Sequence, residues 1–406
     1  MNSEFRGMPQ ARTFGNPNVI RQVFFSHLPL IKDRKNMRTE VISNVIKSGI
    51  YFEGPQNKIL EKKLSRMLSG SLPARLAAKR AGRQGYITTL ASGHDALILA
   101  LAALNLKKED EVIFPVNAYP TAFPVALSGA KPVPCDVNLN GQMDIGKLTN
   151  AINKNSRAVI TVHLYGMTGD IDKIRKICHE KKVVLIEDCA QSLGTKFGGK
   201  PLGTFGEISC FSFYPTKNLG SLGDGGAIWT KNRDYYNYFL KAKSYGERTR
   251  YDSEFVSGHS RLPEVQAAIL NLYTKMLPRY FRKRKLLFQL YQEKLELLFP
   301  RVRVLKSDQN SDPVPHILVI DVDKRDKLAA YLAKKEIPTL IHYPKPIHLV
   351  KAFSYLGFKR GDFPMAERLS KRILSLPFHP LLSEGALEQI CATIKEFYVR
   401  SEKLEI

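Results

Sequence analysis

The sequence lacks a long hydrophobic segment. Its longest helix-like apolar run, Ala96–Leu106, is too short to cross a bilayer. The first residues, Met1–Arg12, are polar and have no apolar centre of the kind found in a secretory signal. We therefore expect a cytoplasmic protein that does not enter a membrane.

Cysteine is also scarce. The five cysteines are scattered through 406 residues, odd in number and without the spacing of a metal site. Cys189 and Cys210 fall in or next to apolar strand-like segments, where cysteine behaves as a small hydrophobic residue. This pattern favours a reducing compartment and predicts no metal site.

Acidic residues are few relative to basic ones, 38 against 62, which gives a formal net charge of +24. Such a charge is typical of proteins that bind nucleic acid, a membrane surface or an anionic substrate. Here the basic residues are dispersed rather than gathered with aromatic residues, so we expect a solvated basic surface and no nucleic-acid partner. The basic stretch Ser71–Arg83 favours a surface loop, with contact to a partner or an anionic substrate as the alternative. The basic run within Arg279–Lys285 is typical of an exposed helix face.

Strand-like and helix-like segments alternate between Gly85 and Thr230. The expected strands are Tyr86–Leu90, Glu111–Val116, Lys131–Asp136, Ala158–His163, Val183–Glu187, Ile208–Phe213 and Gly226–Thr230. The expected helices are His94–Leu106, Thr121–Leu127, Ile145–Asn153 and Ile171–Glu180. This alternation predicts an α/β fold with a mainly parallel seven-stranded sheet covered on both faces, with one antiparallel strand after the Gly-rich connection.

The length allows two or three domains. Outside the alternating region we expect a helix over Arg38–Ser48, a long helix from Arg261 towards Leu298 with a break near Pro278, a strand over His316–Val322, and helices over Lys324–Lys335 and Glu384–Val399. The predicted parts are an N-terminal extension (1–70), a large domain (71–299) and a smaller C-terminal α/β domain (300–406).

Asp188 and Lys217, 29 residues apart, carry the chemistry of this chain. Asp188 follows the apolar strand Val183–Glu187, and Lys217 has aromatic neighbours that indicate a partly buried position. A neutral lysine forms an imine with an aldehyde, and a carboxylate keeps a heterocyclic nitrogen protonated, which together is what pyridoxal phosphate chemistry requires. The alternatives are an aspartate that caps the next turn and a lysine in a surface loop.

Small residues between a strand and a helix provide a candidate phosphate site. In Ala91–His94 they let backbone N–H groups approach an anion, which the helix dipole favours. The Gly-rich segment Gly220–Gly226 indicates either backbone held close to a ligand or a flexible turn.

Taken together, nine segments resemble the DegT-type (DegT/DnrJ) sugar aminotransferases, from about Gly49 onward. The segments are Ser92–Leu97, His163–Gly166, Glu187–Ser192, Gly206–Gly220, Leu222–Ala227, Ser260–Ile269, His342–Leu349, Gly361–Pro364 and Leu374–Pro377. The resemblance implies the type I fold of pyridoxal-phosphate enzymes, which is the aspartate aminotransferase fold, with pyridoxal 5'-phosphate as cofactor.

The resemblance also implies a role for residues around the cofactor ring. Lys217 would carry the internal aldimine and move protons between Cα and C4′. Asp188 would pair with the pyridine nitrogen, and Gln191 with the ring hydroxyl. Ala190 and Tyr119 would lie on the two faces of the ring, where Tyr119 stacks.

Further residues are implied at the phosphate and the substrate. Ser212 and the backbone of Gly93 and His94 would hold the phosphate. His259 stands where the family has an asparagine donated by the neighbouring subunit, and His94 stands where it has threonine. The resemblance implies a separate group of substrate-binding residues: Arg261, Tyr343 and His348.

The implied activity is transfer of an amino group, with L-glutamate as the expected donor, to a keto-sugar that is most often nucleotide-linked. A homodimer is expected, because the family builds each active site at the subunit interface. The alternatives are a sugar dehydratase or a cyclitol aminotransferase of the same family, and a non-catalytic polyanion-binding or regulatory protein on the same scaffold. Family members that dehydrate replace the lysine by histidine, so Lys217 favours transamination.

The two histidines at the phosphate lead to a pH prediction. Imidazole donates to a phosphate more strongly when it is protonated. We expect the affinity for pyridoxal phosphate to fall as the pH rises between about 5 and 8, as measured by titrating apoprotein with cofactor. An affinity that stays flat over that range contradicts a phosphate contact by His94 or His259.

Overall fold

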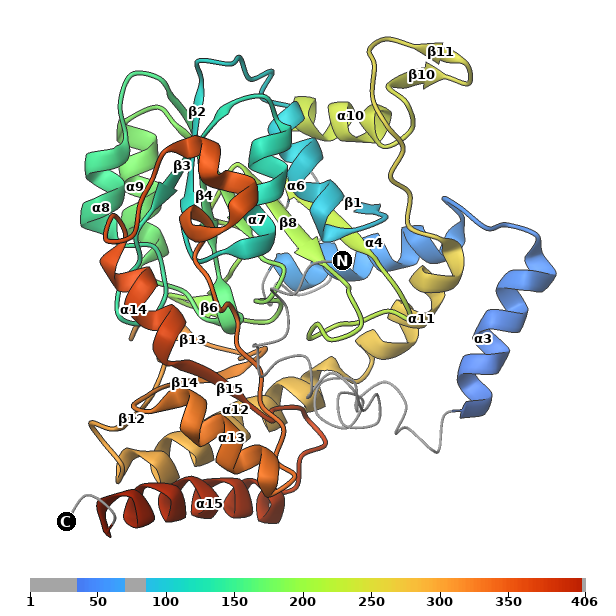
Figure 1. Ribbon diagram of the computed structural model, residues 1–406. Coiled ribbons are helices and arrows are strands. Elements are labelled where there is room, and N and C mark those ends of the chain that lie inside the picture. The colour runs from blue at the N-terminus through green and yellow to red at the C-terminus, as the bar shows by residue number, and fades with distance from the viewer. Residues whose placement is uncertain (1–34, 70–84, 404–406) are drawn as a thin grey trace, which may run out of the picture.

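The computed structural model describes residues 35–69 and 85–403 (Figure 1), so the basic stretch Ser71–Arg83 lies outside the described residues. A seven-stranded sheet with the order β1-β9-β8-β5-β4-β2-β3 forms its centre. The strands are β1 (Tyr86–Leu90), β2 (Glu111–Pro115), β3 (Lys131–Cys135), β4 (Ser156–Val162), β5 (Val184–Asp188), β8 (Ile208–Ser212) and β9 (Gly226–Thr230). Only β9 runs against its neighbours, β1 and β8, which confirms the mainly parallel sheet and its single antiparallel strand.

Helices cover both faces of this sheet (Figure 1). One face packs on α6 (Gly93–Ala102), α7 (Tyr119–Leu127) and α10 (Arg233–Ala242). The other packs on α4 (Pro55–Leu68), α8 (Ile145–Ala151), α9 (Ile171–Glu180) and α11 (Glu264–Thr274). Successive side chains of a strand point to opposite faces, so each strand contributes to both cores.

The C-terminal part forms a third core below the sheet in Figure 1. It contains the antiparallel sheet of β12 (Val302–Val304), β14 (Leu318–Val322) and β15 (Ile373–Leu376), with helices α12 (Leu277–Glu296), α13 (Arg325–Lys334) and α15 (Glu384–Lys403). The remaining elements used below are α3 (Lys35–Ser48), α14 (Pro364–Arg372), β10 (Glu247–Thr249), β11 (Asp252–Ser253) and β13 (Ser311–Asp312). No helix in the described ranges has the length and apolarity needed to cross a bilayer.

Helix α12 differs from its sequence prediction at a buried arginine. The break with α11 falls at Lys275 and Met276, just before Pro278, which lies in the first turn of α12 where its missing N–H is tolerated. Arg284 was predicted to lie on an exposed face, but it is only 2% exposed. It lies on the same stripe as the buried Tyr280 and Leu287, because residues three and four apart share a helix face.

The guanidinium of Arg284 is satisfied by backbone rather than by a carboxylate. Its Nη1 donates to the carbonyl oxygens of Pro315 at 3.2 Å and His316 at 3.1 Å. Burial lowers the pKa of Arg284 to about 9. The side chain thus ties α12 to the segment that leads into β14.

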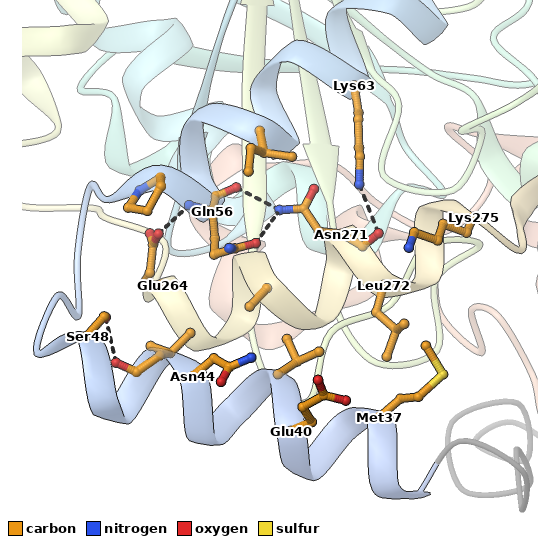
Figure 2. A pocket seen from close by; sticks show the side chains of 15 residues that line it. Met37, Glu40, Asn44, Ser48, Gln56, Lys63, Glu264, Asn271, Leu272 and Lys275 are labelled. Atoms are coloured by element: carbon orange, nitrogen blue, oxygen red, sulfur yellow. Dashed lines mark hydrogen bonds between the residues drawn. The ribbon is translucent and has the colours of Figure 1, made fainter.

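Helix α4 is capped by a residue from α11 rather than by its own sequence. The carboxylate of Glu264, 1% exposed, accepts hydrogen bonds from the backbone of Gly54 at 3.1 Å, of Gln56, and of Asn57 at 3.3 Å. A negative charge at this position satisfies the free N–H groups and the dipole of the helix. Figure 2 shows Glu264 and Asn271 of α11 both reaching the first turn of α4, where the Asn271 amide donates to Gln56.

This cap leads to a stability prediction. The variant Glu264→Gln replaces the carboxylate by an amide, whose NH₂ group faces the N–H groups of α4. We expect the free energy of unfolding to fall by about 1–3 kcal/mol. The measurement is the midpoint of thermal unfolding. The control is Glu254→Gln, which removes an exposed partner of Lys241 outside any helix and is expected to leave the midpoint unchanged. Equal midpoints for both variants would show that α4 does not need this carboxylate.

Candidate functional site

Asp188 and Ser212 lie at the carboxyl ends of β5 and β8, on the sheet face covered by α6 and α7. Ligands of open parallel sheets bind at this edge. The Asp188 side chain is buried and held from two sides. Its Oδ2 accepts a hydrogen bond from Thr121 Oγ1 at 2.8 Å, and its Oδ1 accepts one from the N–H of Ala190 at 3.0 Å. The carboxylate therefore has a fixed orientation at the edge.

Lys217 lies in the turn that follows β8, where its N–H donates to the carbonyl of Tyr214 at 2.8 Å. The residue is half-buried. Burial lowers the pKa of Lys217 to about 8, and the nearby charge of Asp188 raises it in part. A substantial fraction of this amine is therefore neutral near neutral pH, and only the neutral amine attacks a carbonyl.

Gln191 and Tyr343 complete the group around Asp188. The Oε1 of Gln191 accepts a hydrogen bond from the N–H of Tyr165 at 2.7 Å. Burial and the charge of Asp188 raise the pKa of Tyr343 to about 12. A hydrogen bond from Gln191 lowers this pKa, but it does not outweigh the other two effects. The ring of Tyr119 lies 5.9 Å from that of Tyr343. The structure thus brings these sequence-predicted residues together.

The turn Ser92–Gly93 lies directly against the end of β8 and the start of β9. A Cβ atom added to Gly93 would lie 2.6 Å from the Cβ of Ser212, and one added to Gly226 would lie 2.3 Å from the carbonyl carbon of Ser92. Glycine is therefore required at both positions. Ser92 caps α6 by accepting from the N–H of Asp95 at 3.0 Å. The free N–H groups of this helix end, with Ser212 beside them, form a cradle for an anion.

The two unusual histidines occupy exposed positions. His94 is the second residue of α6, next to the cradle. His259 lies at the base of the β10–β11 hairpin, which extends from the body of the protein in Figure 1. Its ring lies 5.3 Å from that of Tyr245.

The predicted substrate residues differ in their surroundings. The guanidinium of Arg261 lies 5.4 Å from the ring centre of Phe52, and its buried Nε has no hydrogen-bond partner among the described residues. His348 is buried and its Nε2 lies 3.0 Å from Oε1 of Glu367, whereas its Nδ1 has no partner within residues 35–69 and 85–403. The preceding Ile347 donates to the carbonyl of Val116 at 2.8 Å, which places this segment at the carboxyl end of β2.

Several polar residues at the site had no role in the sequence analysis. Thr121 holds Asp188, and Tyr165 holds Gln191. His342 lies close to Lys217, and burial together with that lysine lowers the pKa of His342 to about 4. The segments containing Tyr165 and His342 were identified by motif, but nothing in the sequence showed which atoms they contact.

Glu187 points to the opposite face of the sheet from Asp188 and is fully buried. It lies 3.0 Å from His163 Nε2 and accepts hydrogen bonds from the N–H groups of Gly203, Phe205 and Gly206. Burial opposes its ionisation, but these donors outweigh burial and lower the pKa of Glu187. Among the described residues it also forms, with His163 and Cys189, the one trio with metal-donor spacing, but its oxygens are already used by protein donors.

A cavity of about 430 Å³ lies elsewhere, between α3, α4 and α11 (Figure 2). Its lining includes Met37, Glu40 and Leu272 and none of the residues described above around Lys217. It is separate from the cluster at the sheet edge.

The residues at the edge fit pyridoxal phosphate. The glycine cradle beside Ser212 matches a phosphate, the fixed carboxylate of Asp188 matches a ring nitrogen, and Lys217 supplies a largely desolvated amine.

Comparisons with known proteins agree with this fit. The model of the DegT/DnrJ/EryC1/StrS aminotransferase family matches residues 32–395. The chain is 35% identical to the erythromycin biosynthesis sensory transduction protein EryC1 of Saccharopolyspora erythraea, covering 86% of this chain and 92% of that one. It is 31% identical to the dTDP-3-amino-3,4,6-trideoxy-alpha-D-glucose transaminase of Streptomyces venezuelae, covering 89% of this chain and 92% of that one.

A solved structure shows the same fold. The crystal structure of S. venezuelae DesV in complex with a ketimine intermediate superposes with a TM-score of 0.84 at 31% identity, covering 90% of this chain and 95% of that one. The fold predicted from the sequence is confirmed. The chain therefore belongs to the DegT/DnrJ/EryC1/StrS aminotransferase family, and it is a pyridoxal-phosphate-dependent aminotransferase.

Proposed function

We propose that this chain transfers an amino group from L-glutamate to a keto-sugar carried on a nucleotide, with Lys217 as the residue that binds the cofactor and moves protons. The observation that carries the proposal is the half-buried Lys217, whose amine pKa is lowered by burial and raised in part by the fixed carboxylate of Asp188, at the edge where β5 and β8 end. A relative that covers most of this chain is named for a nucleotide-sugar transaminase activity.

Each residue of the cluster has one task in this proposal. When bound, pyridoxal phosphate supplies an aldehyde and an electron-withdrawing ring. Asp188 keeps the ring nitrogen protonated, because Thr121 and the N–H of Ala190 prevent the carboxylate from turning away. Gln191 donates its NH₂ group to the ring hydroxyl, since its oxygen is already used by Tyr165. Lys217 accepts a proton at Nζ from the substrate carbon and returns it.

Neighbouring residues bind the phosphate of the cofactor and contact the two faces of its ring. Ser212 and the N–H groups of Gly93 and His94 bind the phosphate, as the cradle supports. Tyr119, partly exposed at the mouth of the site, and Ala190 contact the two ring faces.

The substrate contacts are proposed for Arg261, Tyr343 and His348. Within the part of the chain that the structure describes, Arg261 has a buried donor and His348 a ring nitrogen without a protein partner. Tyr343 reaches the cluster from the small domain, next to Asp188 and Gln191. The net charge of +24 supports an anionic acceptor such as a nucleotide diphosphate, which a positive surface attracts. We further propose a homodimer in which His259 of the hairpin serves the neighbouring active site.

The first prediction concerns covalent capture by Lys217. Borohydride reduction of the protein with pyridoxal phosphate should attach one cofactor to the peptide that contains Lys217, read by mass spectrometry. Lys217→Ala should abolish the adduct and lower transamination by at least about 1,000-fold, because the nucleophile and proton carrier are lost.

Lys63→Met is the matched control. Burial also lowers the pKa of Lys63, but its Nζ donates to the carbonyl of Asn271 at the helical cavity, away from the site. This variant should keep both the adduct and the activity. Incubation with glutamate should then release 2-oxoglutarate; trapping without this product would favour another amino donor or another reaction class.

The second prediction concerns the pH at which Lys217 becomes reactive. Its pKa of about 8 lies below the ordinary 10.5, so the neutral fraction rises through about pH 8. Reductive methylation with formaldehyde, mapped by mass spectrometry, should follow that rise. Because Asp188 raises this pKa, Asp188→Asn should move the midpoint to lower pH.

The exposed Lys154 provides the internal reference for reagent activity in the same samples. Formaldehyde is suitable because it has no ring nitrogen, so the loss of the Asp188 carboxylate does not change how the reagent binds. A midpoint near 10.5, or one that moves upward in Asp188→Asn, would contradict the proposed environment of Lys217.

A further inference from the structure

Tyr165 connects three parts of the protein with its three polar groups. It lies in the turn Leu164–Gly166 after β4, is 1% exposed, and has a positive φ of 66°. Its N–H donates to Gln191 Oε1 at 2.7 Å, its carbonyl accepts from the N–H of His316 at 2.8 Å, and its hydroxyl donates to the carbonyl of His342 at 2.5 Å. A single residue therefore contacts the cofactor edge and two segments of the small-domain half of the chain.

The N–H of Tyr165 sets the orientation of the Gln191 side chain. An amide has one oxygen and one NH₂ group, and the N–H of Tyr165 can bond only to the oxygen. The NH₂ group must then point the other way, towards Tyr343, in agreement with the hydrogen bond that lowers the pKa of Tyr343. The backbone of Tyr165 thus turns the donor of Gln191 into the site.

The hydroxyl of Tyr165 fixes the segment that carries Tyr343. Its acceptor is the carbonyl of His342, and Tyr343 is the next residue. The ring of His342 lies near Lys217, while that of Tyr343 lies near Asp188 and 5.9 Å from the ring of Tyr119. This hydrogen bond holds the segment from the side of the reacting centre, while bonds of Leu340 and His342 to Ser375 hold it against β15.

The turn has little freedom to move. A Cβ atom on Gly166 would lie 2.6 Å from the nitrogen of His316 and 2.6 Å from the carbonyl oxygen of Val314, so the turn is packed against this connecting segment. The same carbonyl of Val314 accepts from Asn218 Nδ2 at 3.1 Å, and Asn218 follows Lys217 directly. The turn of Tyr165 and the loop of Lys217 are therefore held by one common segment.

We propose that Tyr165 is a positioning residue for the reaction: its hydroxyl holds Tyr343 against the cofactor and substrate, and its backbone aims the amide of Gln191. This inference rests on the proposed function for its kinetic consequences and on the hydrogen bonds alone for its structural ones. Tyr165 itself touches neither substrate nor cofactor in the proposal, and acts through these two residues.

Tyr165→Phe removes only the hydroxyl, and Tyr291→Phe is a matched control. The hydroxyl of Tyr291 also donates to a backbone carbonyl, that of Pro377 at 2.9 Å, and its side chain is fully buried in the small-domain core. Both variants lose one buried hydroxyl-to-carbonyl bond, so similar falls in thermal midpoint are expected. Only Tyr165→Phe should alter the site.

The structural readout is hydrogen exchange of the apoprotein. In Tyr165→Phe the peptide that spans 338–346 should exchange faster than in wild type, and in Tyr291→Phe it should exchange at the wild-type rate. Unchanged exchange in Tyr165→Phe would overturn the inference, whatever the cofactor does.

The kinetic readout uses holoenzyme and a double-mutant cycle with Tyr343→Phe. Tyr165→Phe should keep the trapped adduct at Lys217 and lower kcat/KM for the sugar about tenfold, and in the Tyr343→Phe background it should have little further effect. If the two substitutions have fully additive effects on the activation free energy derived from kcat/KM, Tyr165 does not act through Tyr343, and the inference is overturned. Faster exchange in a protein whose wild type forms no adduct would instead refute the proposed function and leave the positioning of residues 342–343 standing.

Discussion

The pleat of strand β5 sends two neighbouring carboxylates to opposite faces of the sheet, and the site depends on both. Glu187 is a charge in a fully buried place, which is costly unless donors surround it. His163 and the N–H groups of residues 203, 205 and 206 are those donors, and by meeting this requirement they fix the end of the strand. Asp188 therefore lies on a fixed strand end rather than on a loop, and its hydrogen bond with Thr121 sets the orientation of the carboxylate.

The central sheet could be predicted because its strands are short apolar runs with helices between them, a pattern that local sequence carries in full. What could not be predicted depends on partners far along the chain. Helix α4 has no capping side chain of its own, and the carboxylate that caps it, from Glu264, comes 210 residues after Gly54. Arg284 was assigned to the surface by its charge, although the helix period places it inward; the carbonyls of Pro315 and His316 make that burial possible.

The site shows the same difference between features set by local sequence and features set by distant partners. Lys217 and Asp188 could be predicted because each follows a distinct apolar strand and the two side chains together fit one kind of cofactor chemistry. Thr121 and Tyr165 could not, because a hydroxyl donor has no sequence signature and their partners lie 67 and 177 residues away. Motif resemblance marked the segment of Tyr165 without showing which of its atoms mattered. For such residues the three-dimensional contact is the only source of the assignment.

Lys217 is subject to two opposed influences, and both can change during a catalytic cycle. Burial favours the neutral amine, while the charge of Asp188 favours the ammonium form. Any cation that pairs with Asp188 weakens the second influence, so an occupied site holds the amine more strongly neutral than an empty one. Tyr165 also holds the segment of His342, and Lys217 contributes to lowering the pKa of that imidazole. The residues whose charges act on one another here are thus fixed by hydrogen bonds that do not involve the amine itself.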